Sequence, residues 1–199
     1  MNPFTSIEKI LKQASFNKKG VTWHKRLNND LVWIINFQKG KGATKEAFSL
    51  TINIGMYAEG TFELMFGKKL EAYWEPDSFF RERPKFFGSS TEWWNFNNNG
   101  SDGNEKNLKE IESLFVSKIL PFLEMHNTFS SVLPYLPVEK WKSNTNFHGE
   151  LLRLAVACFL FKDNTNVRIL LQRIIDGKTG WDAIAKAILE KTTQNEANI

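Results

Sequence analysis

Two β-type runs on either side of a short polar turn decide the fold. The first is Val21-Thr22-Trp23-His24-Lys25-Arg26-Leu27, and the second is Leu31-Val32-Trp33-Ile34-Ile35-Asn36-Phe37-Gln38. Branched and aromatic residues dominate both runs. The residues between them, Asn28-Asn29-Asp30, are of types that turns favour. The stretch therefore predicts a β-hairpin.

A third strand is expected from Ala47 to Tyr57, after a loop at residues 39–45. Its apolar side chains alternate with polar or small ones, as in a half-buried strand: Phe48, Leu50, Ile52, Ile54 and Met56. Short strands are predicted at Phe79–Arg83 and Glu92–Phe96. Between them and the third strand, Thr61–Phe66 and Leu70–Trp74 are consistent with a further hairpin, or with irregular chain from Leu64 onward.

Helical periodicity appears at both ends of the strand-rich region. Before it, apolar residues recur from Ile7 to Ala14, with Thr5 or Ser6 as the expected cap. After it, a helix of about five turns is expected from Leu108 to Phe122, kinked or ended by Pro121. Three short helices are predicted beyond residue 150: Leu151–Phe161, Val167–Ile175 and Trp181–Leu189.

This order of elements predicts an α+β fold: an N-terminal helix, an antiparallel β-meander packed by helices, and a C-terminal helical subdomain. We expect a sheet domain at residues 1–127 and the helical subdomain, docked on it, at residues 128–199. The start of the chain does not resemble a signal peptide, and no apolar run is long enough to span a membrane. With one cysteine, Cys158, inside an apolar run, the expected location is the cytoplasm.

The charge of the chain is unevenly distributed. The net charge is +4, but the first 60 residues alone carry nine Lys and Arg against four Asp and Glu. Such an excess favours phosphates or an acidic protein as a partner. It is weaker than the clustered basic face of a dedicated DNA-binding protein, and a solvated lysine-rich surface explains it equally well.

No pattern in the sequence indicates a catalytic centre, and we expect no metal and no cofactor. The histidines are scattered, and the glycines of the loop Gly40-Lys41-Gly42-Ala43-Thr44-Lys45 do not have the spacing of a phosphate-binding loop. Asp77, Glu82 and Lys85 only loosely match a metal-dependent nuclease set, and separate surface charges explain them as well.

A cluster of tryptophans and arginines is the most unusual local feature. Because adjacent strand residues face opposite ways, Trp93 and Trp94 cannot both enter one core. Exposed Trp beside Arg is typical of a binding hot spot, although burial of both tryptophans under helices is the competing interpretation. The predicted partner-binding residues are Trp74, Arg81, Arg83 and Trp94, and the segment Trp141–His148 is the second choice.

Several segments together resemble a bacterial family known as domain of unknown function 4304, over roughly residues 5–125. They are Phe16 to Lys25, Ile35-Asn36-Phe37-Gln38-Lys39, Ile52-Asn53-Ile54-Gly55-Met56-Tyr57, Arg81-Glu82-Arg83-Pro84 and Trp93-Trp94. His24-Lys25 departs from the pattern, in which an aromatic residue and Arg are usual. The resemblance implies a compact α+β domain without an established activity, so it assigns no catalytic residue.

Two alternative functions from different classes are considered. The first is a non-enzymatic protein-binding domain, an immunity or antitoxin-like protein that neutralises a toxin or effector by occlusion. The alternative is a nucleic-acid-associated or enzymatic role based on the basic N-terminal strands. Salt-sensitive binding to nucleic acid would favour the second. A salt-resistant complex with the product of a neighbouring gene would favour the first.

Overall fold

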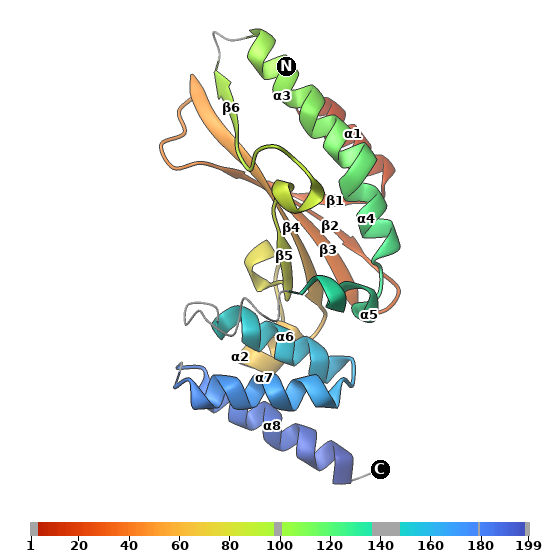
Figure 1. Cartoon of the computed structure of the whole chain (residues 1–199), viewed down its shortest axis with the longest axis vertical. Helices are drawn as coiled ribbons and strands as arrows, with labels where there is room; N and C mark the ends of the chain where they lie inside the picture. Colours follow the sequence, from red (N-terminus) through yellow and green to blue (C-terminus); the bar gives the residue numbers. More distant parts are fainter. Residues whose placement is uncertain (1–3, 98–100, 137–147, 179, 198–199) are drawn as a thin grey trace.

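A computed structural model describes residues 4–97, 101–136, 148–178 and 180–197 of the chain. Within these residues, six strands form one antiparallel sheet, in which β1 to β5 are neighbours in sequence order and β6 pairs with β4. Helices pack against the sheet, so the chain is an α+β protein, as predicted (Figure 1).

The predicted hairpin forms the centre of the sheet. β2 (Thr22–Arg26) pairs with β3 (Leu31–Lys39), and β3 pairs along its whole length with β4 (Ala47–Ala58). The short strand β1 (Asn17–Lys19) pairs with β2 at the edge. The loop that joins β3 to β4 is the glycine-rich segment Gly40–Lys45, which agrees with its prediction as a hairpin loop.

The long strand β4 has two partners on its far side. β5 (Phe80–Glu82) pairs with its second half and β6 (Trp94–Asn97) with its first half. Both strands were predicted. The alternation along β4 also agrees with prediction, because Leu50, Ile52, Ile54 and Met56 are all buried in the main core.

Helices cover one face of the sheet, which we call the helix face. They are α1 (Thr5–Gln13), α3 (Ser101–Leu114), the π-turn η3 (Phe115–Ile119) and α4 (Leu120–Met125) (Figure 1). The last three form one continuous rod. Pro121 neither ends nor breaks it, because the chain passes through a π-turn before the proline, and such turns re-accommodate a disrupted hydrogen-bond ladder. The first turn of α1 has no side-chain cap, contrary to the expected Thr5 or Ser6.

The predicted hairpin at Thr61–Phe66 and Leu70–Trp74 is wrong. Residues Thr61–Phe66 form the short helix α2 instead. Glycines with positive φ angles, Gly60 and Gly67, bracket this helix at 87° and 67°. These left-handed positions turn the chain sharply at both ends, so the apolar run between them cannot continue as an extended strand.

The C-terminal part is helical, as predicted. α5 (Phe129–Val132) and the turn η4 (Leu133–Tyr135) precede α6 (His148–Leu160), α7 (Asn164–Asp176) and α8 (Asp182–Ala197). Figure 1 shows α6, α7 and α8 stacked one after another below the end of the sheet, with α2 and α6 side by side. Their buried side chains belong to the same core cluster as those of the sheet.

Across the described parts of the chain, none of the helices has both the length and the apolar character that crossing a membrane requires.

Candidate functional site

The face of the sheet opposite the helix face carries a group of polar side chains, which we call the amide face. It consists of Thr22 on β2, Asn36 and Gln38 on β3, and Thr51 and Asn53 on β4. The strand register places them side by side: Thr22 lies opposite Asn36, Asn36 opposite Asn53, and Gln38 opposite Thr51. Three neighbouring strands thus present amides and hydroxyls at one level of the sheet.

Hydrogen bonds within the amide face fix the orientation of its side chains. Asn36 Nδ2 donates to Thr22 Oγ1 at 3.0 Å, and Asn53 Nδ2 donates to Gln38 Oε1 at 2.9 Å. A side-chain amide has two donors and an acceptor oxygen with two lone pairs. These two bonds leave part of the hydrogen-bonding capacity of the amides unused. Gln38 is exposed and Asn36 half-buried, whereas Thr22 and Asn53 are buried, so a partner would reach the amide face at Gln38 and Asn36.

Thr51 adds an unsatisfied group in the middle of the amide face. The residue is fully buried, and among the described residues its Oγ1 has no hydrogen-bond partner. A buried hydroxyl left without a partner costs about 1–3 kcal/mol.

Trp93 and Arg83 border the amide face. A Cβ placed on Gly40 would lie 3.6 Å from the Trp93 ring, so this ring packs on the backbone at the end of β3, beside Ser49 of β4. The Arg83 guanidinium lies 5.7 Å from the centre of the ring. The hydroxyl of Thr91 bonds both the N–H and the C=O of Trp93, which holds the tryptophan backbone in place.

Gly55 lies next to Asn53 on the same side of β4, and its missing side chain makes room for a buried acid. A Cβ at this position would lie 2.8 Å from Ser78 Cβ and 3.2 Å from Glu75 Cγ. Glu75 therefore sits directly on the strand, where it is 3% exposed. It accepts a hydrogen bond of 2.7 Å from Nε of Arg81, which lies opposite Gly55 on β5.

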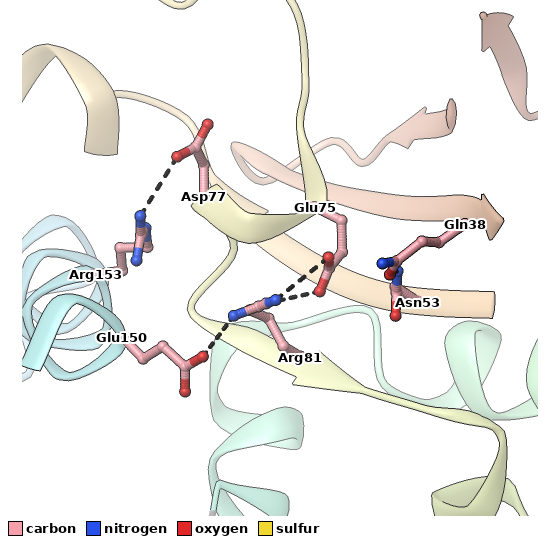
Figure 2. A network of polar contacts seen from close by, with 7 residues as sticks. All are labelled: Gln38, Asn53, Glu75, Asp77, Arg81, Glu150 and Arg153. Carbon is pink, nitrogen blue, oxygen red and sulfur yellow. Dashed lines mark hydrogen bonds and ion pairs between the residues drawn. The ribbon is translucent and has the colours of Figure 1, made fainter. Parts of the chain in front are cut away.

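An ion-pair network extends from Arg81 to the C-terminal helices. Arg81 also binds Glu150 of α6, and Arg153 of α6 lies 3.6 Å from Asp77 (Figure 2). Burial raises the pKa of Asp77 although Arg153 opposes the shift, and burial lowers the pKa of Arg153 itself. The groups satisfy one another, so this network fastens α6 to the sheet region and leaves little for a ligand.

The structure separates the four predicted partner-binding residues. Trp74 is 60% exposed, and Arg83 lies at the surface beside Trp93. Arg81 is engaged by Glu75 and Glu150, so its guanidinium serves the internal network.

Trp94 is 2% exposed and belongs to the main core, so it cannot serve as an exposed anchor in this structure. Its neighbour Trp93 faces the other way, as the alternation of strand side chains requires. Of the second-choice segment Trp141–His148, only His148 lies within the described residues.

Sequence reasoning missed the amide face, although a signal was present. Asn36 and Gln38 are two residues apart on one strand, and so are Thr51 and Asn53 on the next, which puts each pair on one side of its strand. This period of two assigns each pair to one side of its strand, whereas the register that makes the pairs neighbours comes from the fold.

A second polar cluster lies on the same face of the sheet, where α2 and the segment after it pack against the strands. Arg26 donates to the hydroxyl of Tyr73, which in turn bonds Glu59, and the His24 ring packs 4.9 Å from the Tyr73 ring. Burial and the hydrogen bond to Glu59 raise the pKa of Tyr73 to about 12. Burial, with Arg26 nearby, lowers the pKa of His24. The tyrosine therefore stays protonated at neutral pH.

The remaining sequence candidates lie apart from this face. Burial raises the pKa of the Cys158 thiol to about 12, and the residue has no exposed surface. A thiol in that setting is a poor nucleophile at neutral pH. In the parts of the chain that the structure describes, no three His, Cys, Asp or Glu side chains gather where they could hold a metal ion.

Comparison with known proteins identifies a family for the sheet region. No curated protein and no solved structure matches this chain. A family model described as a domain of unknown function, DUF4304, matches residues 7–125. The matched region ends with α4 and contains the whole sheet, including the amide face. Two of the segments that resemble the family, residues 35–39 and 52–57, supply Asn36, Gln38 and Asn53. This chain therefore belongs to the DUF4304 family.

Proposed function

We propose that this protein is a non-enzymatic binding protein whose amide face receives a segment of another protein. One observation carries the proposal: beside the Trp93–Arg83 pair, the side-chain amides have hydrogen-bond donors and acceptors without a partner among the described residues. Side-chain amides pair well with peptide groups, and Trp with Arg is a composition typical of interface hot spots. Adjacent paired strands hold these groups rigidly, which lowers the entropic cost of binding.

The charges around the amide face favour a protein over a nucleic acid as the partner. Arg81 has Glu75 and Glu150 as partners, and Arg83 lies 3.7 Å from Glu92. Nucleic-acid binding depends on cations that are available to neutralise phosphates. The arginines next to the amide face are already matched by carboxylates.

Within this class we propose an immunity or antitoxin role, in which covering the surface of a toxin is itself the function. Occlusion requires a preorganised surface but no reacting group on this chain, and the amide face has that character. The step from binding protein to toxin inhibitor rests on analogy with small domains that act in this way.

The test is binding to the products of neighbouring genes, measured by calorimetry with purified proteins. In a complex, Trp93→Ala is expected to weaken binding by about 2 kcal/mol, roughly 30-fold, because hot-spot aromatics carry much of the interface energy. Gln38→Ala is expected to weaken binding measurably, whereas Gln172→Ala, on the exposed side of α7, provides the matched control. Circular dichroism verifies that each variant is folded.

Two outcomes would contradict the proposal. A complex whose affinity is unchanged by Trp93→Ala and Gln38→Ala would place the interface elsewhere, and Trp74→Ala would then test the exposed predicted anchor. Tight binding to DNA or RNA that collapses as salt is raised would support the nucleic-acid alternative instead.

A further inference from the structure

A large apolar cavity opens between α1 and the β3–β4 hairpin, on the helix face. Its volume is about 650 Å³, within the range of about 300–1,000 Å³ that small-molecule sites occupy. The interior is formed by apolar side chains: Phe4, Ile7, Trp23, Phe37, Phe48 and Leu50. The cavity exists because β2 begins at Thr22, opposite Asn36, while β3 and β4 continue past this level.

Two lysines at the cavity give it a positive rim. The Lys18 ammonium lies 5.4 Å from the centre of the Trp23 ring, and the Lys39 ammonium lies 4.5 Å from the centre of the Phe48 ring. Both lysines, and the aromatic rings beneath them, line the cavity. Their charges are not equivalent. Lys18 forms an ion pair of 2.6 Å with Glu8, whereas no carboxylate of the described residues pairs with Lys39.

The cavity therefore favours a ligand that has an apolar part and one negative charge. An apolar group placed against Trp23, Phe37 and Leu50 would gain from the removal of its surface from water. A carboxylate at the rim would meet the Lys39 ammonium, which is on an exposed side chain over the Phe48 ring and pairs with no carboxylate of the described residues. A cation of the same shape would meet Lys39 as a like charge.

We propose that this cavity binds an amphiphilic carboxylate, such as a medium-chain fatty acid, with its chain in the apolar interior and its carboxylate on Lys39. This site is distinct from partner binding at the amide face, although Asn36 and Gln38 belong to the lining of the cavity and to the amide face. Partner binding could fail its own test without affecting this proposal, because the ligands and the variants differ.

The experiment titrates the whole protein with decanoate, decanol and decyltrimethylammonium, each below its aggregation concentration, by calorimetry. Decanoate is expected to bind with a stoichiometry of one, more tightly than decanol, and the cation not to bind. Lys39→Met removes the charge but keeps the length of the side chain. It is expected to weaken decanoate roughly tenfold, which corresponds to about 1.4 kcal/mol. Lys41→Met, in the adjoining loop and outside the lining, should leave the affinity unchanged.

A second pair of variants tests the cavity itself and does not depend on charge. Val21 lies at the mouth and is 61% exposed, so Val21→Trp is expected to obstruct entry while leaving the fold intact. Val116, at 59% exposure on η3, provides the matched Val116→Trp control. Absence of saturable decanoate binding to the wild-type protein would overturn the proposal. An equal loss of decanoate affinity in Lys39→Met and Lys41→Met would also overturn it. Binding of decanol as tight as that of decanoate would do the same.

Discussion

At the scale of single residues, the packing on β4 beside the amide face depends on one missing side chain. Gly55 allows Glu75 and Ser78 to lie directly on β4, and Glu75 in turn holds Arg81. The φ angle of Gly55 is not in the left-handed region, so the requirement is for space and not for backbone freedom. The absence of a Cβ at this position lets the buried Glu75 carboxylate pack against the strand.

This role gives a prediction for Gly55→Ala. The added methyl group would require Ser78 and Glu75 to move, and overpacking of this kind costs about 1–3 kcal/mol. Gly103→Ala is the matched control, because a Cβ in this position of α3 would meet nothing within 4 Å. Because Ala favours a helix more than Gly does, this control should raise the free energy of unfolding by about 0.5–1 kcal/mol. Chemical denaturation of both variants measures the difference, and a Gly55→Ala protein as stable as wild type would contradict the packing argument.

At the scale of elements, α6 is joined to the sheet region by charge as well as by apolar packing. Arg153 faces Asp77 of the turn η1 (Glu75–Asp77), and Glu150 faces Arg81 of β5. Four residues, two from each side, thus cross the junction as ion pairs. Both members of the Arg153–Asp77 pair are largely buried, so the loss of one partner would leave the other as a poorly solvated charge.

The double-mutant cycle of Arg153→Met and Asp77→Asn tests this junction. Each single change is expected to destabilise the protein by about 1–3 kcal/mol, because the remaining group is unpaired and partly buried. The double change should cost less than the sum, by about 1 kcal/mol, since both partners are then removed. Lys186→Met, on the exposed side of α8, is the control. Additive effects in the cycle would show that the pair contributes no direct coupling.

At the scale of the whole molecule, the family region and the C-terminal helices share one core. The Phe129 ring lies 5.5 Å from Phe79 and stacks 4.8 Å from Phe161 of the α6–α7 connection. Leu160 of α6 reaches the backbone at Gly60, where α2 begins. The match to the family ends at residue 125, so the helices beyond it add to the family region while covering one end of it.

Truncation after residue 127 is therefore expected to expose apolar surface and impair solubility. The deletion would uncover Phe79 and the side of α2 that packs on α6, and no helix remains to replace them. Size-exclusion chromatography and thermal unfolding measure the outcome, with truncation after residue 192, which removes only the end of α8, as the control. If the shorter protein were monomeric and as heat-stable as the full chain, docking of the helices would be unimportant for the sheet domain.

The amino-acid sequence by itself determined most of the secondary structure. It also determined which positions of each strand are apolar and which are polar. The alternation along β4 and the turn residues 28–30 are local signals, so the meander, the N-terminal helix and the C-terminal helices were predictable. The family was also recognisable from short segments. Three short elements were missed: β1, α2 and α5. The apolar run of α2 has no helical period, and only the left-handed glycines on both sides reveal that the chain turns there.

Only the tertiary structure decided which side chains come together. Asn36 and Asn53 are 17 positions apart and become neighbours through strand register, while Arg81 and Glu150 meet only because α6 docks against the sheet. The choice between Trp93 and Trp94 was equally non-local. Alternation requires that they face opposite ways, but which one is buried depends on which side of the sheet α1 and α3 cover. Such pairings depend on long-range packing, which no local pattern of residues encodes.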